Sequence, residues 1–448
     1  MGTDTVRTAT ADEAADRRRE QRGWYFYDWA CSVYSTSVLT VFLGPYLTSV
    51  AKAAADTGGY VHPLGVPVRA GSFFAYSVSL SVIVAVLVMP LVGAAADRTG
   101  RKKPLLGAAA YVGAAATTGM FFLDGDRYLL GGVLLIVANA AQSVAMMLYN
   151  SYLPQIATPE ERDAVSSRGW AFGYAAGSLV LIANLVLYLA HDSFGVSETT
   201  AVRICLASAG LWWGAFTLVP LRRLRDRRSA PREATAPGLR QLAATVRDMR
   251  RHPLTLSFLL AYLIYNDGIQ TVISQASVYG SEELGLGQST LIGAVLLVQV
   301  LAVAGALAMG RLARTYGAKR TILGSLVAWT VTLGAGYFLP AGAPVGFFAL
   351  AAAIGLVLGG SQALSRSLFS HLVPPGKEAE YFSAYEMSDR GMSWLGPLLF
   401  GITYQLTGSY RDAIISLVIF FVIGFMLLAR VPVRRAIGDA GNPVPEKI

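Results

Sequence analysis

The chain has 448 residues, of which 54% are hydrophobic and only 15% are charged. Soluble domains are usually about a quarter charged, so this composition excludes an ordinary soluble protein and favours a chain that crosses a membrane many times. The net charge of +9 does not indicate nucleic-acid binding, because the basic residues fall in short segments between long apolar runs.

The sequence shows no pattern typical of a cofactor or a metal site. The four histidines are far apart, have no ligand spacing and lie at predicted loops or helix ends: His62, His191, His252 and His371. We find neither a phosphate-binding Walker motif nor a nucleophile elbow. Cys31 and Cys205 lie in or beside apolar runs, which argues against a disulfide. We therefore predict no cofactor, no metal and no enzymatic activity.

The apolar runs predict an all-α integral membrane protein with 12 transmembrane helices in two six-helix, pseudo-symmetric halves. We place the helices at about 24–48, 72–96, 104–123, 129–153, 166–190, 201–220, 254–278, 289–311, 319–339, 345–370, 382–406 and 411–430. The corresponding parts are a polar tail (1–23), a first bundle (24–220), a basic linker (221–253), a second bundle (254–430) and a tail (431–448). The tail before the first run has no features of a signal peptide, so we expect that run to be retained.

The basic residues orient these helices. With the N-terminus inside, all but five of the 37 Lys and Arg residues fall on the inner side, and the five are Lys52, Arg69, Arg127, Arg203 and Arg411. The positive-inside rule predicts such an asymmetry. We expect a multi-pass protein of the inner (cytoplasmic) membrane with both termini in the cytoplasm.

Span 1 opens with Trp24-Tyr-Phe-Tyr-Asp28-Trp29-Ala30, which places a carboxylate about one turn inside the membrane. An ionisable group there is costly and needs a partner or a purpose. In one hypothesis Asp28 carries protons or gates a cavity. In the other it bonds a neighbouring helix while the aromatic residues beside it lie at the headgroup level.

The loop after span 2 reads Gly93-Ala-Ala-Ala-Asp97-Arg98-Thr-Gly100-Arg101-Lys102-Lys103. Gly100 permits a sharp turn, and Asp97 can pair with a nearby basic group or cap a helix. The loop after span 8, 310–320, repeats both glycines and the terminal basic pair at an offset of 217 residues, with Arg314 at the acidic position. This relation predicts two halves in parallel repeat.

Spans 4 and 5 carry two further patterns. Asn139, Gln142, Met146 and Asn150 form a stripe down span 4, and they either line a cavity or join helices to one another. On span 5, glycines at every fourth position, 169, 173 and 177, predict a smooth ridge for close packing against another helix.

The linker at 221–253 contains ten arginines, Pro231 and Pro237, and an amphipathic stretch near 239–249. Its simplest interpretation is a topology anchor on anionic lipid. A binding site for a regulatory partner is the alternative.

Span 7 carries Tyr265-Asn266-Asp267-Gly268, and Asp267 lies nearer the membrane midplane than any other acid. Asp267, Gln270 and Ser274 share a helical face by their spacing. A carboxyl group at this depth is either protonated or paired. We predict that Asp267, on a helix that lines the cavity, binds substrate or protons. The alternative is a structural bond to a neighbouring helix.

Spans 10 and 11 supply the remaining charged groups. Gln362 and Arg366 share a face, and Arg366 is close enough to the inner end to extend to water, so a topology charge competes with a gate or anion contact. On span 11, the spacing of Glu386 and Arg390 predicts a pair within one helix. Asp389 has no partner along the sequence, and the loop after span 2 is a candidate to bond it.

Several motifs together resemble one transporter family. They are the loop after span 2, the opening of span 1, Tyr265–Gly268, Asn150-Ser-Tyr-Leu-Pro154, Gln362-Ala-Leu-Ser-Arg366-Ser-Leu-Phe369 and Gly396-Pro397. The loop is typical of the major facilitator superfamily, and the others resemble its vacuole-effluxer-like branch, which includes autophagy-related vacuolar amino-acid effluxers. The resemblance implies a cytoplasmic latch at the loop (Gly93, Asp97, Arg98, Gly100, Arg101 and Lys102), and it implies amino-acid export.

We predict a secondary transporter that moves a small solute, with amino acids implied by the resemblance, by alternating access with proton coupling. It is expected to act as a monomer in the lipid bilayer. Its candidate substrate- or proton-binding residues are Asp267, Asp28, Asn266, Gln270, Asn139, Gln142, Gln362 and Arg366. A membrane sensor that kept the fold but lost transport is the alternative, and an intramembrane enzyme has no motif in its favour.

Overall fold

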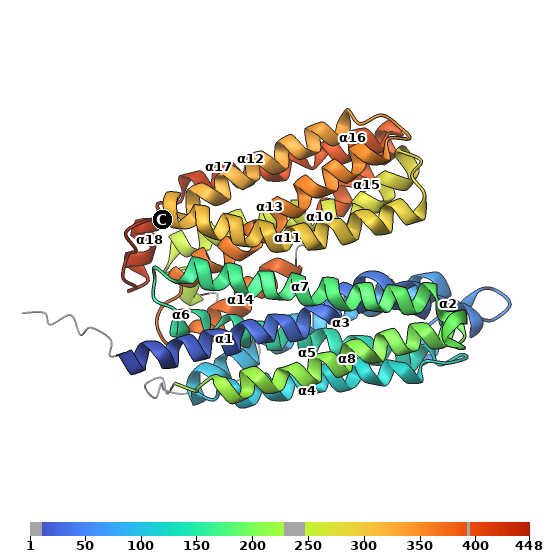
Figure 1. The fold of residues 1–448 in the computed structure, drawn as a ribbon, viewed down its shortest axis with the longest axis horizontal. Helices are drawn as coiled ribbons and strands as arrows, with labels where there is room; N and C mark the ends of the chain where they lie inside the picture. The colour runs from blue at the N-terminus through green and yellow to red at the C-terminus, as the bar shows by residue number, and fades with distance from the viewer. Residues whose placement is uncertain (1–10, 228–246, 392–394) are drawn as a thin grey trace, which may run out of the picture.

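The computed structural model describes residues 11–227, 247–391 and 395–448, and its helices form two bundles that lie side by side along their length (Figure 1). The first bundle contains α1 (Ala11–Val33), the π-helix η1 (Tyr34–Phe42), α2 (Leu43–Ala53), α3 (Phe73–Thr99), α4 (Lys102–Gly119), α5 (Tyr128–Asn150), α6 (Leu153–Ile156), α7 (Arg162–Leu189) and α8 (Glu198–Arg223). Short 3-10 turns and one two-stranded ribbon complete it. In that ribbon, between α2 and α3, β1 (Tyr60–Val61) pairs antiparallel with β2 (Val68–Arg69).

The second bundle repeats the plan. It contains α10 (Pro253–Val278), the short π-helix η6 (Tyr279–Glu283), α11 (Gln288–Tyr316), α12 (Ala318–Tyr337), α13 (Pro344–His371), α14 (Glu378–Gly391), α15 (Leu395–Thr407), α16 (Tyr410–Ser416), α17 (Val418–Arg430) and α18 (Val433–Asp439). The start of α1 and the end of the chain lie at the same end of the molecule (Figure 1). We call it the terminal end, and the other the opposite end.

Ten of the described helical segments are long and apolar enough to cross a membrane. The two remaining predicted spans correspond to α12 and to α14 with α15. Lys319, Arg320 and several Thr and Gly residues lower the hydropathy of α12, and span 11 includes residues 392–394, which lie outside the described ranges. With these, the all-helical, two-bundle fold expected for 12 spans is confirmed. The linker prediction falls largely on residues 228–246, outside the described ranges.

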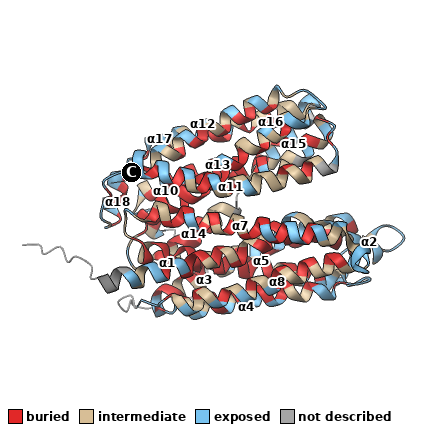
Figure 2. Ribbon diagram, viewed as in Figure 1, coloured by how far each residue is buried: buried red, intermediate tan, exposed pale blue. Residues whose placement is uncertain are grey.

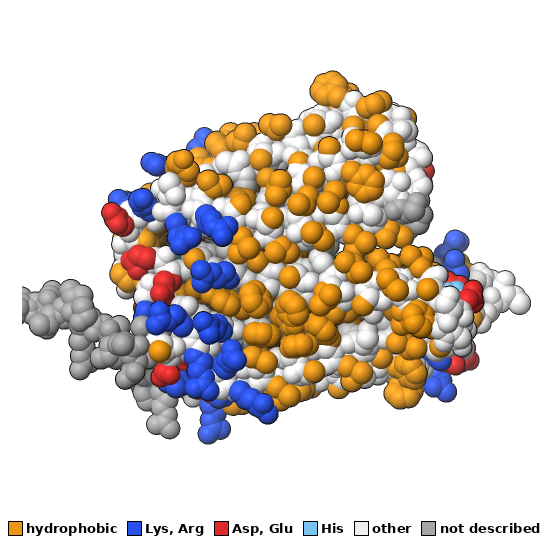
Figure 3. All heavy atoms as spheres, viewed as in Figure 1, with side chains coloured by type: hydrophobic (Ala, Val, Ile, Leu, Met, Phe, Trp, Pro, Cys, Tyr) orange, Lys and Arg blue, Asp and Glu red, His pale blue; other side chains and the backbone are white. Residues whose placement is uncertain are grey.

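The surface has the distribution expected of a membrane protein. On α3, Leu80, Ile83 and Leu87 are about half exposed, while Ser77 and Ser81 face inward and are buried. Figure 2 shows buried residues where the helices face one another within the bundles, and Figure 3 shows hydrophobic side chains over the long sides with Lys and Arg gathered at the terminal end. Apolar side chains on the outside and polar ones inside are what a hydrocarbon solvent favours.

The predicted glycine ridge packs against span 1 and positions its polar side chains. A Cβ added at Gly169 would lie 2.7 Å from Asp28 Oδ2. One at Gly173 would lie 2.5 Å from Ser32 Oγ, and one at Gly177 would lie 2.6 Å from Thr36 Oγ1. Because no side chain fits there, α7 can approach α1 and η1 closely, which confirms the prediction of close packing and positions Asp28 against α7.

Candidate functional site

A cavity of about 740 Å³ lies between the two bundles. Its walls come from α1, η1, α5 and α7 on one side and from α10, α11, α13 and α14 on the other. Six of its polar or charged lining residues were predicted from the sequence: Asp28, Asn139, Gln142, Gln270, Gln362 and Arg366. Larger apolar side chains such as Leu39, Leu291 and Phe347 line the part farther from the terminal end. The cavity therefore has charged groups toward the terminal end and apolar walls beyond them.

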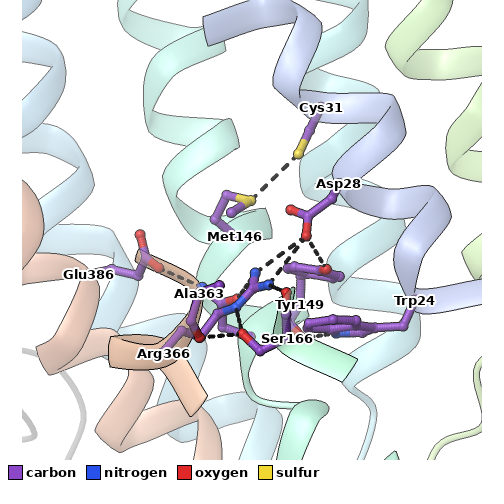
Figure 4. Close-up of polar contacts among 10 residues, drawn as sticks. Trp24, Asp28, Cys31, Met146, Tyr149, Ser166, Ala363, Arg366 and Glu386 are labelled. Atoms are coloured by element: carbon purple, nitrogen blue, oxygen red, sulfur yellow. Dashed lines mark hydrogen bonds and ion pairs between the residues drawn. The ribbon is translucent and has the colours of Figure 1, made fainter. Parts of the chain in front are cut away.

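The centre of the charged region is an ion pair between Asp28 on α1 and Arg366 on α13 (Figure 4). Both are buried, and the Arg366 Nη1 and Nη2 atoms lie 3.4 and 3.5 Å from Asp28 Oδ2. The Tyr149 hydroxyl donates to the same oxygen at 2.6 Å. Charge-assisted bonds are usually 2.7–2.9 Å long, so Asp28 is held closely by the tyrosine and more loosely by the arginine.

The remaining donors of Arg366 are also satisfied by the first bundle. Nε donates to Ser166 Oγ and Nη2 to Ser166 O, both at 2.9 Å, and Nη1 donates to Asn150 Oδ1 at 3.1 Å. The guanidinium also lies over the rings of Trp24, at 4.7 Å from the centroid, and Trp170, at 5.4 Å. Of the two alternatives for Arg366, the structure therefore does not show the one in which the side chain extends outward to water. Its fork of donors instead joins the two halves.

A second connection between the bundles continues from Asn150. Its Nδ2 donates to Glu386 Oε1 on α14 at 2.7 Å, while its Oδ1 accepts from Arg366. Glu386 Oε1 is thus bonded to the first half, and the predicted pair of Glu386 with Arg390 stays a prediction. The side chain of Arg390 lies outside the described residues. Asn150 thus links a carboxylate of the second half to the central ion pair.

The stripe on α5 lines the cavity along its whole length, through Asn139, Gln142, Met146 and Asn150. Asn139 Nδ2 donates to Ser81 Oγ at 2.6 Å and Gln142 Nε2 donates to Ser35 Oγ at 2.7 Å. Gln142 Oε1 is buried and accepts no hydrogen bond within the described part of the chain. The two alternatives for the stripe therefore both hold, because these side chains join helices and line the cavity as well.

In the second half, amides and a carboxylate form a chain beside the cavity. Gln362 Nε2 donates to Asn266 Oδ1 at 2.7 Å, and Asn266 Nδ2 donates to Asp389 Oδ1 at 2.6 Å. Tyr262 donates to the same carboxylate oxygen at 2.9 Å. Asp389 is thus bonded to α10, and the suggested bond to the loop after span 2 is wrong. Asn266 acts behind the lining, through Gln362 and Asp389, since it does not itself line the cavity.

Asp267 lies elsewhere. It is buried, and its Oδ2 accepts from the backbone N–H of Gly396 in α15 at 2.7 Å. Its helix lines the cavity through Gln270 and Thr271, but Asp267 is not among the lining residues. The helical spacing placed it on the Gln270 face, whereas the structure turns its carboxylate toward α15. This geometry corresponds to the structural alternative rather than to a ligand site.

The loop after span 2 bonds the second bundle at the terminal end. Lys102 Nζ lies 3.0 Å from both Asp97 Oδ1 and Glu378 Oε2, and all three side chains are buried. Asp97 Oδ2 also accepts from the backbone N–H of Glu380 at 2.9 Å. Asp97 thus bonds the first residues of α14, where a helix leaves its N–H groups unpaired.

The glycines of this loop have the roles that the motif suggested. Gly100 adopts a left-handed conformation with φ of 65°, and a Cβ at Gly93 would lie 2.9 Å from Ala379 O of α14. Arg98 and Arg101 are exposed. The latch in this structure therefore consists of Gly93, Asp97, Gly100 and Lys102, which contact Glu378, Ala379 and Glu380.

The repeated loop of the second half forms a different contact. Arg314, which replaces the acid, is exposed. A Cβ at Gly310 would lie 2.4 Å from Ser167 Oγ, so α11 and α7 still pack closely. The polar bonds here come from α7 instead: the buried Arg162 donates to Ser370 O at 2.9 Å, and Ser166 donates to Ala363 O at 2.6 Å.

Sequence reasoning missed several residues of the site. Tyr149, Trp24 and Trp170 surround Arg366, yet aromatic residues in membrane helices are too common to indicate such a role. Ser166 gave no signal at all. Trp24 and Asn150 did occur in the motifs quoted above. The available clue was that Trp24 stands in the same motif as Asp28.

Comparison with known proteins agrees with this architecture. The family model described as "Vacuole effluxer Atg22 like" matches residues 16–441. A Bacillus subtilis protein named "Uncharacterized MFS-type transporter YxiO" is 31% identical over 419 residues, which are 92% of this chain and 95% of that protein. Autophagy-related protein 22 of Pyricularia oryzae is 26% identical over 90% of this chain and 75% of its own length.

Solved structures share the fold. A crystal structure of the major facilitator transporter FucP in the outward conformation has a TM-score of 0.68 at 14% identity, and the match covers 92% of this chain and 98% of that one. The proton:xylose symporter XylE has a TM-score of 0.65, with 93% and 94% covered. These relatives are transporters, not enzymes, and the chain belongs to the Atg22-like vacuole effluxer family of multi-pass major facilitator transporters.

Proposed function

We propose that this protein moves a small polar solute, with amino acids as the first class to test, across the cytoplasmic membrane by proton-coupled alternating access. The terminal end, with its many Lys and Arg residues, faces the cytoplasm in this proposal. The polypeptide works as a monomer, and the segments 24–220 and 254–430 are the two bodies that rock about the cavity.

The observation that carries the proposal is the Asp28–Arg366 pair at the cavity wall, with one charge contributed by each half. A zwitterion offers groups that complement this site. Its carboxylate suits the donor fork of Arg366. Its ammonium group suits acceptors such as Gln142 Oε1, which has no partner in the described chain.

Proton coupling follows from competition for Arg366. The Arg366 Nη1 and Nη2 atoms lie 3.4 and 3.5 Å from Asp28 Oδ2, which is longer than a strong charge-assisted hydrogen bond. A ligand carboxylate that came closer to the guanidinium would therefore replace Asp28 as its partner. An aspartate that loses its cationic partner in a buried site takes up a proton. A substrate carboxylate bound to Arg366 would then be accompanied by a proton on Asp28. This couples the movement of substrate to the movement of a proton.

Proteoliposomes provide the test. An amino-acid panel is assayed for exchange at zero gradient and for uptake driven by a proton gradient, with Asp28→Asn and Asp267→Asn compared as matched acid-to-amide changes. We expect Asp28→Asn to lose gradient-driven uptake and keep exchange, and Asp267→Asn to keep both. If Asp267→Asn alone loses gradient-driven uptake, the proton site is at Asp267 and not at Asp28. Absence of transport for every amino acid would exclude that substrate class.

A further inference from the structure

Four arginines form a pocket at the terminal end, away from the cavity. Arg18, Arg19 and Arg22 of α1 and Arg223 of α8 line it, and its volume is about 340 Å³. α1 and α8 lie side by side (Figure 1), and a Cβ at Gly23 would lie 2.6 Å from Arg223 Cβ. The absence of a side chain at Gly23 therefore lets Arg223 approach the three arginines of α1.

The acids near this pocket are bonded to other arginines. Asp16 pairs with Arg225 at 2.7 Å and Glu20 with Arg227 at 2.5 Å. Glu161 lies 3.4 Å from Arg17. Within the described residues, none of the four pocket arginines forms an ion pair with an acid. Four guanidinium groups around one pocket, with no acid among its lining residues, are suited to an anion with several oxygens, above all a phosphate.

The same two helices carry an aromatic strip directly beyond the pocket. Phe26 and Trp29 follow Arg22 on the same face of α1, by four and seven residues. Phe216 and Trp212 precede Arg223 by seven and eleven residues on α8. Phe26 stacks with Phe216 at 6.4 Å between centroids, and Trp29 contacts Trp212 at 5.7 Å. All four rings are partly exposed, as expected for residues at the level where headgroups meet acyl chains.

We propose that this pocket binds the phosphate headgroup of an anionic phospholipid, whose acyl chains lie along the strip formed by Phe26, Trp29, Trp212 and Phe216. The arginines alone would suit any phosphate. The aromatic strip, which begins about one helical turn from Arg22, favours a ligand with an acyl chain over a free phosphate ion. The lipid would join α1, which carries Asp28, to α8 and would stabilise the first bundle.

The test uses the full-length protein in nanodiscs and in detergent. Native mass spectrometry counts retained phosphatidylglycerol, and thermal unfolding is followed with phosphatidylglycerol, phosphatidylcholine or inorganic phosphate added. The variant changes Arg18, Arg19, Arg22 and Arg223 to Gln. A matched control changes four exposed arginines of the same end in the second half, Arg311, Arg314, Arg320 and Arg430, to Gln.

We expect phosphatidylglycerol alone to raise the melting temperature and to be retained, with roughly fivefold weaker binding for each pocket arginine removed. The control variant should retain the lipid, and Phe26→Ala with Phe216→Ala should weaken retention without removing charge. Equal retention by the pocket variant and the unchanged protein would overturn the proposal. So would equal loss in the control variant, or an equal shift with inorganic phosphate.

Discussion

The two ends of the molecule are held together in different ways. At the terminal end, buried charged groups bond one bundle to the other: Lys102 to Glu378, Arg366 to Asp28 and Arg162 to Ser370 O. At the opposite end the described strong contacts stay within a bundle, as in Arg203 with Asp124 at 2.9 Å and Arg411 with Glu283 at 2.7 Å. Among the described residues, the buried charged groups that bond the two bundles thus lie toward the terminal end.

This difference indicates how the transporter would change state. In the proposed alternating access, rocking of the bundles would have to break the bonds at the terminal end and would leave those at the opposite end intact. Between the ends, the described cross-bundle bond is that of Gln299 Nε2 to Thr36 Oγ1, at 3.2 Å, in the π-helical part of span 1. Substitutions at the terminal end should therefore alter the balance of states, and substitutions at the opposite end should affect only local stability.

The largest effect is expected for Arg366→Met. Without Arg366, the buried Asp28 either stays as an uncompensated charge or takes up a proton, and removing one partner of such a pair costs about 3–5 kcal/mol. Arg411→Met is the matched control, because this arginine is half-buried and bonds within its own bundle, where about 1 kcal/mol or less is expected. Thermal unfolding of both variants in the same detergent measures the difference. Equal destabilisation would show that the two ends do not differ.

The next effect is expected at the latch. Lys102→Met leaves two buried carboxylates, Asp97 and Glu378, without their shared cation, and should disfavour the closed terminal end by about 1.5–3 kcal/mol. Arg101→Met is the control, because it also removes one positive charge, but from an exposed neighbouring side chain that does not bond Asp97 or Glu378. Reactivity of a cysteine placed at Ser166 toward a thiol reagent from the terminal side reports opening. A reactivity unchanged by Lys102→Met, or raised equally by Arg101→Met, would contradict the latch.

Gly93→Ala separates packing from charge. The added methyl would lie 2.9 Å from Ala379 O, so α3 and α14 must move apart at a cost of about 1–3 kcal/mol. At Gly324 nothing lies within 4 Å of an added Cβ, so Gly324→Ala should be neutral or slightly stabilising. The same cysteine assay should detect opening in the first variant only. Identical behaviour of both would exclude a close contact at Gly93.

The smallest effect concerns the ribbon at the opposite end. Asp56 accepts from the N–H groups of Gly58 and Tyr60, and the pKa of its carboxyl is lowered by the bond to His62 and then by that of Tyr60. Because the folded pKa is lowered, these bonds are present above the usual aspartate value of about 4 and are lost as the pH falls through the lowered value. Hydrogen exchange at Gly58 should accelerate there. Any coupled opening of the terminal end would contradict the independence of the two ends.

Much of this arrangement could be predicted from the sequence, where local spacing decides it. The stripe Asn139–Asn150 and the ridge at 169–177 lie where helical periodicity places them, and Gly100 takes the turn that its lack of a side chain allows. The twelve spans followed from hydropathy, and the described helices fit them.

The partners of the charged residues could not be predicted, because they come from distant parts of the chain. Arg366 and Asp28 are separated by 338 residues. The rotation of α10, which turns Asp267 toward Gly396 and Gln270 toward the cavity, depends on packing against α15 that helical spacing alone does not contain. Sequence patterns therefore indicated the right faces of several helices, but they suggested the wrong partner for Asp389.

Distances between spin labels across the two bundles test the central claim most directly. One pair replaces the exposed Arg98 and Arg314 at the terminal end, and the other replaces Ser193 and Ala341 at the opposite end. With Asp28 and Arg366 intact, the terminal pair should give a single short distance. In the Arg366→Met background, we predict that this distance lengthens or broadens while the opposite pair shortens. Unchanged distances at both ends would contradict the claim that the Asp28–Arg366 pair holds the bundles closed.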